Sequence, residues 1–206
     1  MSEPIEPTGP LAADVAATFA RLSRRRFLRV AGVAAAAGVL PAGCRDLPPE
    51  LVPPPDLVLG VLSPRGYATF RAVAMRMVGP RGAEAILAGA GGGAGSIDPA
   101  RAADRWALRV PALAGPLAQG LWLLEWGLPP LLAKWRPFTA LDGAEQDRVL
   151  DDCMRSRLDL KRDLFKGLRS LALLTYYADP AGRAALGLPQ PFDAAGIATA
   201  MGDLDG

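Results

Sequence analysis

Apolar residues recur at helical spacing in the long segments of this 206-residue chain. The spacing predicts helices over 64–78, 99–109, 143–155 and 157–178, because apolar side chains three and four residues apart share one helix face. Capping residues stand directly before the first three of these segments: Ser63, Asp98 and Asp142. No segment alternates as a strand does. We therefore expect an all-α fold, a compact helical bundle of about five to seven helices.

The segment 112–127 is almost wholly apolar. A helix that is apolar on all sides is buried, and this segment is shorter than the roughly 20 apolar residues that span a bilayer. It is therefore either the central core helix or part of a protein interface. Trp122 and Trp126 are interface candidates, because tryptophan is enriched at interface hot spots. Core packing would explain both residues as well.

Residues 23–29 read Ser-Arg-Arg-Arg-Phe-Leu-Arg and lead into a short run rich in Ala, Gly and Val. This arrangement resembles a twin-arginine export signal. The signal segment is then residues 1–43, and its key residues are Ser23, Arg24, Arg25, Phe27 and Leu28. The twin-arginine translocase carries proteins that are already folded. We therefore expect the rest of the chain to be periplasmic.

Ala42-Gly43-Cys44 resembles the end of a lipobox, which makes Cys44 a lipidation candidate. The lipid, or the signal itself, would then hold the protein at a membrane. Cleavage near Ala42 and an uncleaved anchor are the alternatives. Residues 44–60 contain five prolines and are expected to form an extended tether. One helical domain over 61–206 should follow.

The chain has no histidine and only two cysteines. A Ser-His-Asp triad, a Cys-His nucleophile pair, a histidine-bound zinc and a histidine-ligated haem are therefore excluded. The second cysteine, Cys153, lies on the apolar side of a predicted helix and should be a buried small hydrophobe. We expect no catalytic, cofactor-binding or metal-ligating residue in this chain.

Three other patterns have ordinary explanations. Outside residues 1–43 the acidic and basic residues balance, which leaves no basic footprint for nucleic-acid binding. The paired carboxylates at 151–152 and 159–163 are of the type that glycosidases use, but they alternate with Arg and Lys and should be solvated. The glycine-rich run 89–95 follows a short helical piece, 83–88, and no strand. It should therefore be a loop rather than a dinucleotide-binding turn.

A more specific pattern lies near the C-terminus. It reads Phe-Lys-Gly-Leu-Arg-Ser-Leu-Ala-Leu-Leu-Thr-Tyr-Tyr-Ala-Asp-Pro over 165–180 and Ala-Leu-Gly-Leu-Pro-Gln-Pro-Phe over 185–192. Together with Leu-Ser-Pro at 62–64, these segments resemble the two ends of the gluconate 2-dehydrogenase subunit 3 family. That family has a Tyr-Tyr-Ser-Asp-Pro break and a Leu-Gly-Tyr-Pro-Gly-Pro segment. Here the serine, the tyrosine and the second glycine are replaced by Ala178, Leu188 and Gln190.

The resemblance implies a small, non-catalytic helical subunit of a membrane-associated, flavin-dependent dehydrogenase that oxidises sugars, sugar acids or alcohols. Its partner would be a glucose–methanol–choline-type (GMC-type) flavoprotein large subunit, which holds FAD and the active site. A multihaem cytochrome c often accepts the electrons in such complexes. The small subunit carries the export signal for a large subunit that lacks one, and so assists its folding, export and anchoring.

Tyr176 and Tyr177 stand just before the helix break at Asp179-Pro180. They either pack against the bundle or dock on the flavoprotein. Two other hypotheses for the whole chain remain: a stand-alone periplasmic lipoprotein with a structural or binding role, and an enzyme in its own right, which the absence of histidine disfavours. A neighbouring gene for a flavin dehydrogenase without a signal would separate the subunit from the lipoprotein.

Overall fold

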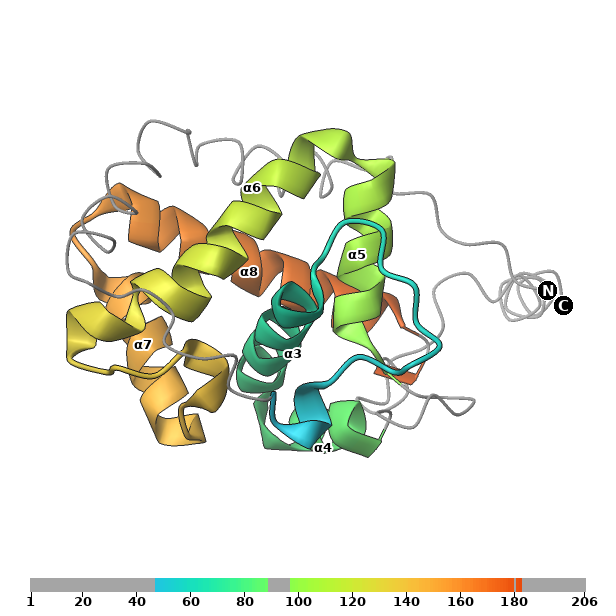
Figure 1. The fold of residues 1–206 in the computed structure, drawn as a ribbon, viewed down its shortest axis with the longest axis horizontal. Helices are drawn as coiled ribbons and strands as arrows, with labels where there is room; N and C mark the ends of the chain where they lie inside the picture. The colour runs from blue at the N-terminus through green and yellow to red at the C-terminus, as the bar shows by residue number, and fades with distance from the viewer. Residues whose placement is uncertain (1–46, 89–96, 180, 183–206) are drawn as a thin grey trace, which may run out of the picture.

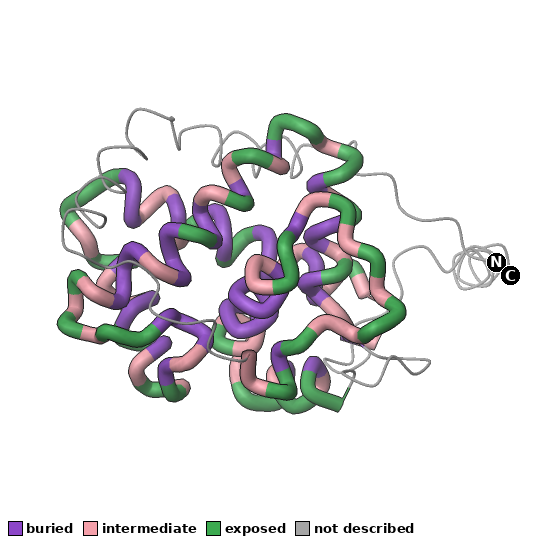
Figure 2. The backbone as a smooth tube through the Cα atoms, in the orientation of Figure 1, coloured by how far each residue is buried: buried purple, intermediate pink, exposed green. Residues whose placement is uncertain are grey.

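Helix α3 (Pro64–Met77) lies in the middle of the fold and packs against most of the other elements (Figure 1). The computed structural model describes residues 47–88, 97–179, 181 and 182. The Ser63 hydroxyl accepts a hydrogen bond from the N–H of Gly66 at 3.0 Å, and Pro64 follows in the first turn, as the sequence predicted. Every residue from Tyr67 to Ala74 is buried (Figure 2). This part of α3 is therefore covered on all sides by other elements and has no solvent-exposed face.

The described residues form six α-helices and four short helical turns, and no strand occurs among them. One hydrophobic core extends from Leu51 to Tyr176 and includes residues of all six α-helices. The predicted all-α, compact helical fold is confirmed.

Helix α4 (Gly79–Ala88) begins directly where α3 ends. Gly79 has a φ of 77°, in the left-handed region that glycine adopts without steric cost. The sequence predicted a break over 79–82 and a short helical piece at 83–88. The break is shorter than that, because one left-handed residue is enough to redirect the chain, and the helix resumes at once.

Helices α5 (Pro99–Arg109) and α6 (Pro111–Trp122) follow. The Asp98 carboxylate accepts from the N–H of Arg101 at 3.0 Å and so caps α5, as predicted. The single helix predicted over 112–127 is divided: α6 passes into a π-helical turn, η3 (Leu123–Gly127). Two short 3-10 turns, η4 (Pro129–Leu132) and η5 (Phe138–Ala140), follow η3 and precede the next helix.

Helices α7 (Gly143–Arg155) and α8 (Asp159–Ala178) complete the described part. Asp142 caps α7 through a capping box, in which its side chain accepts from the N–H of Glu145 at 2.8 Å. Cys153 faces the core with 1 % of its surface exposed, as expected for a small hydrophobe. Burial raises the pKa of its thiol to about 12.

The described part of the predicted tether, residues 47–60, lies against the helices instead of standing free. It begins with a 3-10 turn, η1 (Pro49–Leu51), in which Leu51 is 4 % exposed. Leu47, Leu57 and Leu59 also pack against the core. The difference has a simple cause: the prolines favour an extended chain, but the leucines between them gain more by leaving water.

A buried arginine at the centre of α3 joins four elements. The Arg71 guanidinium donates to the carbonyl oxygen of Glu50 at 3.0 Å and to that of Ile86 at 2.7 Å, and it lies 3.8 Å from Asp98. The Tyr67 hydroxyl donates to Asp98 at 2.8 Å, and burial followed by the negative charge of Asp98 raises the pKa of that hydroxyl. Buried charges need such partners, so Arg71 fixes η1, α4 and the start of α5 around α3.

Candidate functional site

A groove lies between the start of α3 and the end of α6. Its volume is about 170 Å³, and its main lining residues are Leu62, Arg65, Leu121, Trp122, Glu125 and Trp126. Small-molecule sites usually measure about 300–1,000 Å³. The groove is smaller than such sites and is about the size of one large side chain.

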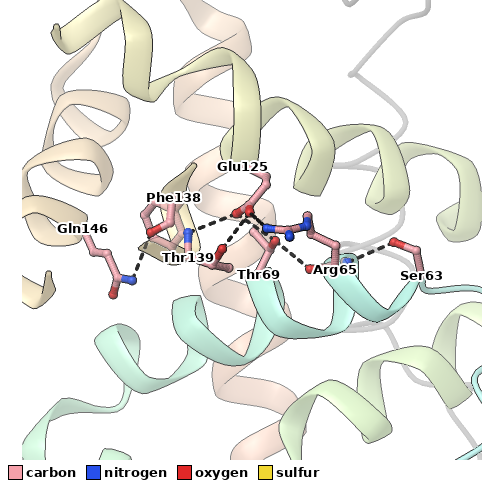
Figure 3. A network of polar contacts seen from close by, with 8 residues as sticks. Ser63, Arg65, Thr69, Glu125, Phe138, Thr139 and Gln146 are labelled. Carbon is pink, nitrogen blue, oxygen red and sulfur yellow. Dashed lines mark hydrogen bonds and ion pairs between the residues drawn. The ribbon is translucent and has the colours of Figure 1, made fainter. Parts of the chain in front are cut away.

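The buried carboxylate of Glu125 lines this groove, and we call it the floor; Figure 3 shows its polar contacts. Glu125 is 1 % exposed, and Thr139 supplies two of its donors: the hydroxyl at 2.7 Å and the backbone N–H at 3.1 Å. From α3, the Arg65 guanidinium donates at 3.0 Å and the Thr69 hydroxyl at 3.1 Å. With four donors satisfied, this carboxylate acts as a structural anchor that fastens the end of α6 to α3 and η5.

Arg65 has a second role at the wall of the groove. Its guanidinium carbon lies 5.2 Å from the centroid of the Trp126 ring, within the range of a cation–π interaction. Its charge is also balanced by Glu125 at 3.0 Å. The floor and one wall are therefore electrically neutral, and the groove presents mainly apolar surface.

The π-helical turn η3 sets the positions of the groove residues. The N–H of Leu128 donates to the carbonyl oxygen of Leu123 at 3.0 Å, five residues earlier. Glu125 and Trp126 follow Trp122 by three and four residues and so lie on its side of the helix. Turns of this kind inside α-helices occur frequently at functional sites.

The structure brings together two of the four aromatic residues predicted as interface candidates. Trp122 and Trp126 both line the groove, and Trp122 keeps 45 % of its surface exposed. Tyr176 and Tyr177 lie near the end of α8, and their ring centroids are 5.2 Å apart in an edge-to-face arrangement. Tyr176 is 2 % exposed and belongs to the core, so it offers no surface to a partner in this conformation. Tyr177 is half-buried.

Three of the four acidic residues considered for general acid–base catalysis, Asp151, Asp152 and Asp159, are held in ion pairs. Asp151 lies 2.9 Å from Arg155, and Asp152 lies 2.6 Å from Lys161. Asp159 pairs with Arg162 on the surface of α8. The Asp151 and Asp159 pairs match the solvated, charge-laced faces that the sequence predicted. The pair of Asp152 does not, because Lys161 is 9 % exposed. Within residues 47–88 and 97–179, no group of three or more Cys, Asp or Glu side chains could hold a metal ion.

Several sequence predictions lie outside the described residues. These are the export-signal residues Ser23, Arg24, Arg25, Phe27 and Leu28, the lipidation candidate Cys44, the glycine-rich run 89–95 and the C-terminal segment 185–192.

Sequence reasoning missed the roles of Glu125, Arg65 and the two threonines. A signal was present, since Glu125 is the only charged residue in the apolar run 112–127. A lone carboxylate in such a run must find donors when the run is buried. What the sequence could not show was which distant residues would supply those donors, because they come from α3 and η5.

Comparisons of the chain with protein-family models, with curated proteins and with solved structures gave no match. Among the residues that the structure describes, no helix is both long enough and apolar enough to cross a membrane.

Proposed function

We propose that this chain is a non-catalytic small subunit of a periplasmic, membrane-associated, flavin-dependent dehydrogenase for sugars, sugar acids or alcohols. It assists folding, export and anchoring of a GMC-type large subunit that holds FAD. The observation that carries this proposal is the combination of an export signal at 23–29 with the C-terminal pattern of 165–192 in one chain.

The chemistry of the chain supports a partner that carries the cofactor. Export in the folded state is useful when a cofactor must be inserted beforehand, yet this chain has no histidine and only two cysteines. The FAD then belongs to the partner, and the electrons pass from it to an acceptor such as a multihaem cytochrome c. Substrate contacts lie in the large subunit.

The groove between α3 and α6 supports a docking role. Trp122 is large, half-exposed and placed above a buried, hydrogen-bonded floor. Interface hot spots are typically aromatic residues beside well-packed pockets. An apolar side chain of the flavoprotein that entered the groove would contact Trp122 and Trp126 together. A complex that survives export needs about 1,600 Å² of buried surface, so the groove is the centre of a larger contact.

The docking role is tested with Trp122→Ala. We expect affinity for the flavoprotein to fall about 30-fold or more, which corresponds to about 2 kcal/mol, while the melting temperature stays nearly unchanged. Trp135→Ala is the matched control, because Trp135 is 73 % exposed and does not line the groove. Equal losses for both variants, or a lower melting temperature as the only change, would contradict docking through the groove.

A stand-alone periplasmic lipoprotein is the second candidate function. The observation that favours it is the Ala42-Gly43-Cys44 sequence, which needs no partner to explain it. Affinity purification of the tagged chain separates the two. A co-purifying flavoprotein supports the subunit, and a chain that purifies alone under conditions that keep other dehydrogenase complexes intact supports the lipoprotein.

A further inference from the structure

Three arginines form a stripe along the outer face of α5. Arg101, Arg105 and Arg109 are four residues apart, and all three are exposed. The opposite face of α5 is buried and consists mainly of the alanines Ala100, Ala103 and Ala107. Residues at this spacing lie about 6 Å apart along a helix axis, so three positive charges project on the same side.

None of these three arginines forms an ion pair with a residue in the described part of the chain. The ion pairs there involve other cations: those of α3, of α7 and α8, and of the residues just after η4. No side-chain hydrogen bond of Arg101, Arg105 or Arg109 is found among those residues either. Elsewhere in the fold exposed arginines do find carboxylates, as Arg76 does with Asp147 at 2.6 Å. The stripe is thus a local excess of positive charge on a domain whose overall charge is balanced.

Two exposed apolar side chains adjoin the stripe. Leu108, which is 54 % exposed, lies between Arg105 and Arg109 in sequence and packs over Gly60. Val58, two residues before Gly60, is 90 % exposed. Figure 1 shows the segment from η1 to α3, which contains Val58, passing in front of α5. Cationic and apolar groups therefore share one surface.

This surface is rigidly built. The Asp104 carboxylate, 3 % exposed on α5, accepts from the backbone N–H groups of Gly60, Val61 and Leu62 at 2.9, 2.9 and 2.7 Å. These bonds fix the segment that carries Val58 against the helix that carries the arginines. A surface that is already ordered loses little conformational entropy when it binds.

We propose that this α5 surface rests on the anionic lipid headgroups of a membrane, with the arginines at the phosphates and Leu108 and Val58 at the start of the acyl region. A row of like charges on a convex helix suits a plane of many negative groups, and apolar residues beside basic ones are typical of interfacial binding.

Lipidation of Cys44 would also bring the domain to a membrane. Only two residues separate Cys44 from Leu47, where the described chain begins, and three residue steps reach at most about 10 Å. Because residues 47–62 pack on the domain, a lipid on Cys44 would hold the domain close to the bilayer. This statement about Cys44 rests on the proposed function, because it assumes lipidation and a membrane location. The argument from the arginines does not depend on the proposed function.

The test is binding of the full chain to vesicles, measured by flotation. Arg21, Arg24, Arg25, Arg26 and Arg29 are replaced by Gln in every variant so that the signal segment does not contribute. Vesicles of phosphatidylcholine alone are compared with vesicles containing phosphatidylglycerol. Each arginine near an anionic surface strengthens binding about fivefold, so replacing Arg101, Arg105 and Arg109 by Gln should weaken it on the order of 100-fold. Replacing the same three by Lys should largely preserve it.

A matched control removes three exposed cations from another face: Arg157, Lys166 and Arg169, each changed to Gln. We expect this control to bind like the parent chain. Equal weakening of both triple variants, or binding that does not depend on phosphatidylglycerol, overturns the proposal. Normal vesicle binding by the α5 variant also overturns it. Loss of the flavoprotein by this variant in a separate co-purification would then assign the stripe to a protein partner. The vesicle experiment contains no flavoprotein, so it can fail while the Trp122→Ala experiment succeeds.

Discussion

Glu125 has the greatest structural consequence of any single residue near the groove. It is 1 % exposed, and its carboxylate receives hydrogen bonds from residues of α3 and from Thr139 of η5. The net contribution of such a buried pair to stability is small, because desolvation offsets the attraction. Removing the carboxylate is costly, because the buried donors of Thr139 are left without an acceptor.

We predict that Glu125→Ala lowers the free energy of unfolding by about 3 kcal/mol, because the buried hydroxyl and N–H of Thr139 lose their acceptor and each such donor costs about 1–3 kcal/mol. Glu125→Gln should cost less, because the amide oxygen still accepts. Urea denaturation measures both. Glu84→Ala, at an exposed site on α4, is the control and should change stability by no more than about 0.5 kcal/mol. A Glu125→Ala variant as stable as the control would show that the carboxylate does not hold the groove together.

Cys153 gives the folded protein a pH dependence in the alkaline range. Burial raises the pKa of its thiol to about 12, whereas an exposed thiol titrates near about 8.5. Below about pH 8.5 both the folded and the unfolded chain keep the proton. Above that pH the unfolded chain releases a proton that the folded chain retains, so stability is lost as the pH rises.

We predict that the free energy of unfolding falls between about pH 8.5 and 10, with a slope that approaches about 1.4 kcal/mol per pH unit. Cys153→Ala should remove this slope. Tyr67, whose pKa is also raised by burial, adds its own loss only above about pH 10. Urea titrations at several pH values provide the measurement. An identical slope in the parent and the variant would mean that the thiol is not buried as described.

Single-residue roles could be predicted from the sequence only where the partners are close in sequence. The caps Ser63, Asp98 and Asp142 were found, because each bonds within its own first turn. The roles of Glu125 and Arg71 were not, because their partners lie in other elements. Tyr176 illustrates the same limit: its spacing allowed both packing and docking, and only the structure shows it in the core.

Among the elements, the segment between η1 and α3 depends most on one side chain. Asp104 of α5 accepts three consecutive backbone N–H groups, from Gly60 to Leu62. These donors would otherwise be partly buried without an acceptor, which costs about 1–3 kcal/mol for each group.

We predict that Asp104→Ala lowers the free energy of unfolding by about 3 kcal/mol or more and accelerates hydrogen exchange at Gly60, Val61 and Leu62. Asp104→Asn keeps one acceptor oxygen and should show a smaller effect at the same amides. Hydrogen exchange followed by mass spectrometry or NMR checks both variants, with the α7 amides as the internal reference. Unchanged exchange at Gly60–Leu62 in Asp104→Ala would contradict the anchoring role.

The elements themselves followed closely from the sequence. Four helices, α3, α5, α7 and α8, begin and end within about two residues of their predicted bounds, because apolar spacing and capping residues act locally. Two features did not follow. One is the π-helical turn η3 at the end of α6, whose Glu125 bonds to residues of α3 and η5. The other is the packing of the leucines of residues 47–60 against a core that sequence spacing does not reveal.

For the whole molecule, the account depends on how the chain and its partner leave the cytoplasm. The chain has no histidine and only two cysteines, whereas its N-terminal segment resembles a signal for folded proteins. The proposed function explains why a chain with so few candidate cofactor ligands would have a signal for folded proteins: the flavin-loaded large subunit is exported while bound to this chain. The complex must then form before export, and both subunits must depend on one signal.

The most direct test is to replace Arg24 and Arg25 by Lys and to measure flavin dehydrogenase activity in the cytoplasmic and periplasmic fractions of cells that encode both proteins. We predict that the activity is retained in the cytoplasm, with the enzyme folded and FAD-bound, because its only export signal has been inactivated. Lys166 and Arg169 changed to Gln provide a control on α8, where export should be normal. Dehydrogenase activity that reaches the periplasm while this chain stays behind would contradict the shared-export mechanism.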